Sequence, residues 1–155
     1  MKWKKQDIQQ YVKSKEYIDT AIIPLVPFSL DRSDEELASL TYQNEVMELF
    51  SDRLEKEYKG RVFRLPSYTY IKSSTLEQET ERLNLFYEEI SKQPFKYVFW
   101  LTFDSRWKKY EKGLEGHLLW VPVMKEGDLN NEETQKLLLD QLEQVTDLIK
   151  SYWSE

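Results

Sequence analysis

The chain has 155 residues, a length that suits one domain able to bury roughly two thirds of the surface of its unfolded chain. The composition, 40% hydrophobic and 32% charged with four glycines and five prolines, excludes disordered, fibrous and low-complexity proteins. The lack of cysteine excludes disulfides, cysteine-ligated zinc, thiol catalysis and iron–sulfur clusters, and a net charge of −6 argues against nucleic-acid binding through phosphate neutralisation.

The first predicted element is a helical segment over residues 1–18. Ile8, Tyr11 and Val12 have the spacing of one narrow apolar stripe on a short helix between residues 4 and 15. No apolar run follows the polar start of the chain, so we expect neither a signal peptide nor an integral membrane segment, and a cytoplasmic location.

A strand and a long helix should follow. The continuous apolar run over residues 21–28 is typical of a buried strand. Pro24 and Pro27 each remove a ladder donor, so this strand should be short, or an edge near its end. Ser33, followed by three acidic residues, predicts the start of a helix that runs to about Tyr58.

The middle of the chain repeats this pattern. Residues 61–65 predict a second short strand that ends at Pro66. Residues 67–72 then form a connection to a helix that begins near Ser74 and stops before Pro94.

The strongest strand signal lies in residues 95–103, which are nearly all aromatic, β-branched or otherwise apolar and predict a central strand covered on both faces. Asp104 should cap a short basic turn over residues 105–112. Residues 117–123 predict a fourth strand, and residues 132–153 predict a helix with its leucines on one face.

This order of elements predicts an α/β class and a single-domain layered fold over residues 1–155, with a mainly parallel four-stranded sheet flanked by helices. The connection between the third and fourth strands is short, so the fourth strand should be antiparallel at an edge or follow a minimal crossover. Residues 126–155 form an acidic C-terminal helix with eight acidic and two basic residues, while residues 1–125 balance at 20 of each.

The common catalytic and cofactor signatures are missing. No glycine-rich phosphate loop matches, and no histidine pair has metal-ligand spacing. His117 is the one histidine and is more readily explained as a structural or surface residue than as a catalytic one. We therefore expect no cofactor and no metal.

If a site exists, it should lie where parallel strands end at their carboxyl edge. The polar and aromatic residues that emerge there are Ser29, Arg32, Ser67, Tyr70, Asp104, Ser105, Arg106 and Trp107. Asp104 is the acid candidate, and Arg32 or Arg106 is the candidate partner for an anion. The alternative is structural: Asp104 caps a helix, and the serines belong to turns.

Two further features suit contact with another molecule. The segment 106–112 alternates basic and aromatic residues, which suits nucleobase stacking, an anionic membrane surface, or a solvated turn with Trp107 folded inward. Residues 137–139 are three consecutive leucines, which widen the apolar stripe of the C-terminal helix beyond one face. Trp3 and Trp153 are additional candidate anchors.

Three stretches carry a family resemblance. They are residues 15–20 leading into 23–25, the segment Leu65-Pro66-Ser67-Tyr68-Thr69-Tyr70, and the segment from Leu101 to Lys108. Over nearly the whole chain they resemble the YpiF-like family, a bacterial domain of unknown function. The resemblance implies a small cytosolic bacterial protein whose genes lie beside those of a cytochrome b/c-type quinol oxidase module, which would suit a respiratory or assembly role.

Two functions follow from these features. The first is a non-enzymatic interaction or accessory protein that holds a protein partner through Trp107, Trp153 or the C-terminal helix. The alternative is a small-ligand-binding protein or hydrolase-type enzyme with its site at the carboxyl ends of the strands, where Asp104 would act as acid, base or metal ligand and Arg32 would hold an anion.

Overall fold

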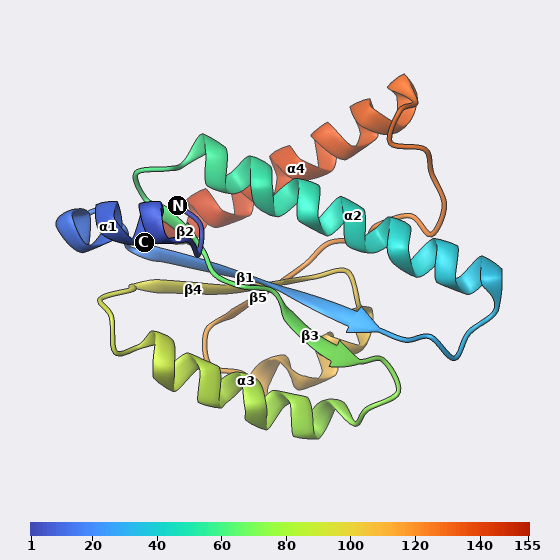
Figure 1. Cartoon of the computed structure of the whole chain (residues 1–155), viewed down its shortest axis with the longest axis horizontal. Coiled ribbons are helices and arrows are strands. Elements are labelled where there is room, and N and C mark those ends of the chain that lie inside the picture. The colour runs from blue at the N-terminus through green and yellow to red at the C-terminus, as the bar shows by residue number, and fades with distance from the viewer.

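The computed structural model describes all 155 residues, Met1 to Glu155. Helices lie on both sides of one twisted sheet (Figure 1), which confirms the predicted α/β class. In chain order the elements are α1 (Lys5–Ser14), β1 (Thr20–Phe28), α2 (Asp34–Glu57), β2 (Val62–Arg64), β3 (Tyr68–Ile71), α3 (Leu76–Ile90), β4 (Tyr97–Thr102), the 3₁₀ helix η1 (Ser105–Gly113), β5 (His117–Trp120) and α4 (Glu132–Trp153).

The sheet has five strands, not the four that the sequence predicts, and every pair is parallel. The order is β2-β1-β4-β5, and β3 also pairs with β1. Because β5 runs parallel to β4, the short connection between them is the minimal crossover, and η1 is the element that makes it. The antiparallel alternative is therefore wrong.

The additional strand is β3, which together with β2 forms one interrupted edge along β1. Ile22 pairs with Arg64 and Leu25 pairs with Tyr68, so the edge chain has one more residue than β1 between these two positions. Pro66 lies in that interruption, where its missing N–H costs no ladder hydrogen bond. The proline signal predicts the end of a strand correctly, but it conceals that pairing resumes two residues later.

The two prolines of β1 are accommodated by the same geometry. The N–H of Thr20 donates to the Arg61 carbonyl on the β2 side, and since successive N–H groups of a strand alternate in side, the Pro24 nitrogen faces the interruption between β2 and β3. The Pro27 nitrogen faces the other side, where pairing with β4 has already ended at Pro24. The strand is therefore nine residues long and central at first, and it becomes an edge on the β4 side near its end, as predicted.

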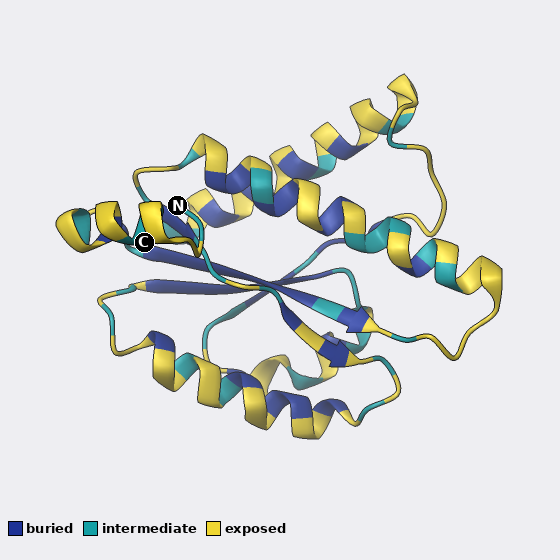
Figure 2. Cartoon of the chain, viewed as in Figure 1, coloured by how far each residue is buried: buried dark blue, intermediate teal, exposed yellow.

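Two apolar cores lie on opposite faces of the sheet, and the strands between them are buried (Figure 2). On one face Phe50 of α2 and Ile149 of α4 join a core with Phe99 of β4. On the other face Leu83 of α3 joins a core with Trp100, the next residue of β4. All six residues of β4 are buried, which confirms it as the central strand covered on both faces.

The starts of α2 and α4 also agree with the sequence, whereas the N-cap residue of α3, Thr75, makes no side-chain capping bond. The Ser33 hydroxyl accepts from the Glu36 N–H at the start of α2, and the Asn131 side chain accepts from two N–H groups at the start of α4. Capping of this kind contributes about 1 kcal/mol per helix. The helix α1 lies beside the amino ends of the strands, near the C-terminus (Figure 1).

Candidate functional site

The eight residues predicted to form one crevice lie in three separate places. Ser29 and Arg32 stay together in the loop after β1, where Arg32 Nε donates to Ser29 Oγ at 3.4 Å. Arg32 also lies 3.7 Å from the Glu36 carboxylate, one turn into α2. Neither residue contacts Asp104, so the predicted pairing of an acid with an Arg32 anion site is not assembled.

Ser67 belongs to a second group, beneath α2. Its hydroxyl donates to Glu48 Oε1 at 3.3 Å. Arg64 bonds the other oxygen of Glu48 and also lies 2.7 Å from Asp52, and its side chain is 15% exposed. This cluster fastens the interrupted β2–β3 edge to α2 and uses Ser67 as a structural donor.

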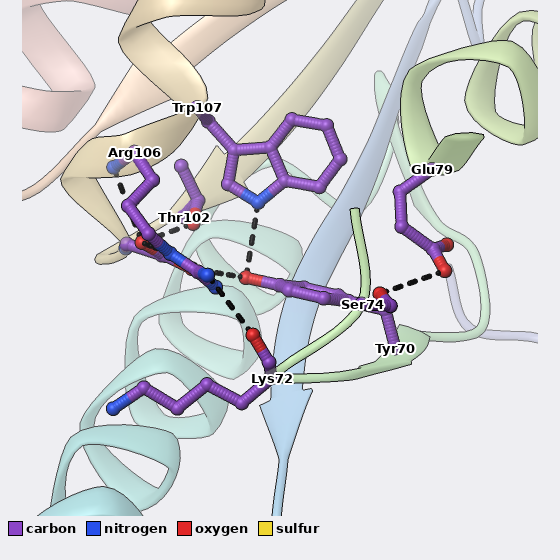
Figure 3. A network of polar contacts seen from close by, with 8 residues as sticks. Tyr70, Lys72, Ser74, Glu79, Thr102, Arg106 and Trp107 are labelled. Carbon is purple, nitrogen blue, oxygen red and sulfur yellow. Dashed lines mark hydrogen bonds and ion pairs between the residues drawn. The ribbon is translucent and has the colours of Figure 1, made fainter. Parts of the chain in front are cut away.

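The remaining residues converge. Tyr70, Asp104, Arg106 and Trp107, called the tyrosine clasp below, come from β3, from the end of β4 and from η1. The Tyr70 hydroxyl donates to Asp104 Oδ2 at 2.8 Å and accepts from the indole Nε1 of Trp107 at 3.0 Å. Figure 3 shows the phenol of Tyr70 reaching the indole across the end of the sheet. Ser105 is exposed and forms no side-chain hydrogen bond in this cluster.

Asp104 and Arg106 close the clasp. Arg106 Nε lies 3.0 Å and 3.1 Å from the two carboxylate oxygens of Asp104, and Nη2 lies 2.6 Å from Oδ2. The Asp104 carboxylate also accepts from the backbone N–H of Arg106, which confirms the predicted capping of η1. Arg106 Nη1 donates to the carbonyl of Lys72, just after β3, so the guanidinium links the end of β3 to Asp104 at the end of β4.

Burial and charge set the protonation of the clasp. Burial raises the pKa of Asp104, but hydrogen bonds from Arg106 and Tyr70 and the guanidinium charge outweigh burial, so that this pKa lies below its ordinary value. Burial, and then the neighbouring Asp104 carboxylate, raise the pKa of Tyr70 well above its ordinary value. The pair therefore stays as a carboxylate and a neutral phenol across the physiological range.

The clasp is arranged for structure more than for proton transfer. A general base needs a pKa near the working pH and a lone pair free to reach substrate. Both oxygens of Asp104 already accept hydrogen bonds from within the protein, and its pKa is lowered. Arg106, the second predicted anion partner, has its charge matched by Asp104. No group of three or more His, Asp or Glu side chains lies in a position to hold a metal ion.

Trp107 and Trp153, the predicted docking residues, are less exposed than that role requires. Trp107 is fully buried, so the prediction that it contacts a partner is wrong, because the clasp turns its indole into the core. Trp153 is half-buried: its Nε1 donates to Thr20 Oγ1 at 2.9 Å, and Arg61 stacks 4.0 Å above its ring. The exposed anchor of the three is Trp3, at 64%.

Two apolar grooves lie away from the predicted crevice. The α2–α4 groove, of about 690 Å³, has Phe50 and Leu138 in its lining together with the more exposed Leu49 and Leu139. The α1–α3 groove, of about 700 Å³, lies between α1 and the later part of α3. Two residues of the leucine triplet 137–139 line the first groove, the buried Leu138 and the exposed Leu139, whereas Leu137 is exposed outside it. The sequence pattern around Leu49 does not identify it as a groove residue, because its neighbour Phe50 belongs to the core.

Comparison with known proteins identifies similar proteins, but none of those found has a described activity. A family model described as a protein of unknown function, DUF2487, matches residues 9–153. The uncharacterized protein YpiF of Bacillus subtilis strain 168 is 30% identical over 154 residues, covering 99% of each chain. No solved structure matches this chain. None of its helices has the length and apolar character needed to cross a membrane.

Proposed function

Since the chain belongs to the DUF2487 family of proteins of unknown function, we propose its function from its surface: a non-enzymatic interaction protein whose α2–α4 groove binds a basic amphipathic helix of a protein partner. The observation that carries the proposal is the groove itself, which lies between the two longest helices and combines apolar walls with acidic surroundings.

The lining of the groove suits the apolar face of a helix. Phe50, Leu138 and Leu142 form buried parts of it, whereas Leu49 and Leu139 are 36% and 53% exposed. Burying one leucine side chain completely contributes roughly 1.5–3 kcal/mol. Amphipathic helices bind in grooves of this kind through apolar residues spaced three or four apart.

Charge favours a basic partner. The helices α2 and α4 contain thirteen acidic and four basic residues, a net charge of −9 against −6 for the whole chain. Of the charged residues that line the groove, Glu48 and Asp52 are paired with Arg64, while neither Glu45 nor Arg53 has an ion pair, so the negative charge comes from the two helices as a whole. Fixed negative charge beside an apolar groove speeds encounter with basic segments and repels acidic ones.

The non-enzymatic part of the proposal is supported by the tyrosine clasp. The acid, the guanidinium and the phenol that could act on a substrate are bonded to one another. The alternative, an enzyme or ligand-binding protein at the carboxyl ends of the strands, would require those bonds to break on binding.

Site-specific photocrosslinking in cells of the producing organism tests the proposal. A photoreactive amino acid replaces Leu139 in one version and Leu148 in another, because Leu148 is 45% exposed on the same helix and does not line the groove. We expect a discrete crosslinked partner at position 139 and none at 148, with the crosslink in a basic amphipathic segment that mass spectrometry identifies.

A synthetic peptide of the crosslinked segment then gives the energetics. We expect Leu139→Asp to weaken its affinity at least about tenfold, and Leu148→Asp to leave it within about twofold. Circular dichroism controls for the fold of both variants. Equal crosslinking at the two positions, or an acidic crosslinked segment, contradicts the proposal.

A further inference from the structure

We propose that the α1–α3 groove binds a small amphiphile, a straight alkyl chain that ends in a carboxylate. This groove shares no lining residue with the α2–α4 groove, so the proposal is independent of the partner proposed above.

The groove is mainly apolar and of ligand size. Ten of its fifteen lining residues are hydrophobic, and its volume of about 700 Å³ falls within the range of about 300–1,000 Å³ typical of small-molecule sites. Trp3, Val12 and Phe86 line it while remaining 64%, 61% and 50% exposed. Large apolar side chains gathered around one depression mark a binding surface more often than scattered ones do.

The inner side of the groove is already formed. Tyr11, Phe63 and Phe95 pack against one another, with ring centroids 5.0 Å, 5.9 Å and 6.2 Å apart. Tyr11 and Phe63 are almost fully buried, at 5% and 1% exposure. A rigid aromatic surface of this kind loses little conformational entropy when a ligand is added.

The shape suits an extended chain. Ile8, Tyr11 and Val12 of α1 line the groove together with Lys15, the residue that follows its last turn, and all four have the spacing of one helix face. The distance from residue 8 to residue 15 is about 10 Å along the helix axis at about 1.5 Å per step. The apolar path therefore runs along α1 and ends at a lysine.

Two hydrogen-bond donors in the lining have no protein acceptor. The Tyr11 hydroxyl donates to Gln93 Oε1 at 3.1 Å, which orients the amide and leaves its NH₂ group without a protein acceptor. Lys15 has no ion pair, and its Nζ lies 5.8 Å from the Tyr11 ring centroid. Lys92 also lines the groove, but Glu89 matches its charge.

These donors select the headgroup. Lys15 and Gln93 both line the groove, and the ammonium and the amide can each donate a hydrogen bond to a compact anion such as a carboxylate. The segment 1–18 adds to this preference, because it contains five lysines against Asp7 and Glu16. A cationic headgroup would be repelled, and a neutral one would lose the charge-assisted bond.

Calorimetric titration of the full chain with decanoate, below its micellar concentration, tests the proposal. Decan-1-ol and decyltrimethylammonium supply the same alkyl length with a neutral and a cationic end. We expect saturable binding of decanoate, binding of the alcohol about fivefold weaker, and no binding of the cation. Amide chemical-shift changes should be confined to the segments that line the groove, residues 3–15, 23, 63–66 and 86–95.

Matched variants separate the groove from the rest of the surface. Val12→Asp should weaken decanoate binding about tenfold, while Leu85→Asp, at a residue of α3 that is 64% exposed and does not line the groove, should not. Lys15→Glu should weaken it about fivefold, while Lys13→Glu, the same charge change on α1 outside the lining, should have little effect.

Three results overturn the proposal: no binding of monomeric decanoate, equal binding of all three amphiphiles, or indifference to Val12→Asp. The first of these can be accompanied by cosedimentation of the protein with phosphatidylglycerol vesicles. That result would identify this face as a membrane-surface contact instead of a ligand site.

Discussion

Replacing Tyr70 by phenylalanine tests whether the tyrosine clasp holds the fold together. The change removes one hydroxyl and keeps the ring, which packs at 5.4 Å from Trp107. The hydrogen bond to the Asp104 carboxylate is lost, at roughly 1.5–3 kcal/mol, and the buried indole N–H loses its acceptor, at roughly 1–3 kcal/mol. We expect a loss of about 3 kcal/mol of unfolding free energy.

Urea denaturation measures this loss, and the dependence of free energy on urea should be unchanged, because the surface exposed on unfolding is the same. A loss of this size lowers the melting temperature of a 155-residue chain by about 6 to 12 °C. Tyr17→Phe is the matched control, since Tyr17 is 66% exposed. If Tyr70→Phe costs no more than Tyr17→Phe, the clasp does not stabilise the protein. Binding at either groove should be the same in both variants.

Three further changes test other parts of the structure. Asp104→Asn should cost about 2 kcal/mol of unfolding free energy at pH 7. Because the pKa of Asp104 in the folded protein lies below its unfolded value of about 3.9, this advantage of the wild type should be present at neutral pH and disappear as the pH falls below about 4. Denaturation at several pH values measures the change. Trp153→Phe should cost about 1 to 2 kcal/mol in chemical denaturation, because the bond to Thr20 and part of the Arg61 stacking are lost, and an unchanged midpoint would contradict this. Gly116→Ala should lower the melting temperature, since φ is +84° and an added Cβ would lie 3.1 Å from Trp100 Nε1; a stability equal to wild type would show that the turn relaxes freely.

The candidate site was predictable in part. That Asp104 caps a turn follows from its place between an apolar strand and a basic segment, and this role is confirmed. The sequence also places Tyr70 and Asp104 at the same edge of the sheet. It does not reveal that Arg106 turns back onto Asp104, since an i, i+2 contact depends on the tight winding of η1. Nor does it reveal that Arg32 and Ser67 lie with other partners, because those contacts are made to Glu36 and Glu48 of α2.

What the sequence determined by itself was local in origin. Apolar periodicity and caps set the bounds of α2 and α4 almost to the residue, and continuous apolar runs set β1 and β4. The motifs at residues 65–70 and 101–108 identified a YpiF-like relationship, which family membership confirms. These signals succeed because the hydrogen bonds and the apolar face of a helix depend on neighbours three or four residues away, and a strand buried on both faces is marked by a continuous apolar run.

The tertiary structure alone decided which surfaces are open. The strand β3 exists because β1 extends beyond β2, and Trp107 is buried because β3 brings Tyr70 to it. Both grooves lie between elements far apart in the chain: α2 with α4, and α1 with α3. Packing between such elements depends on the shape of whole side-chain layers, which no window of the sequence contains.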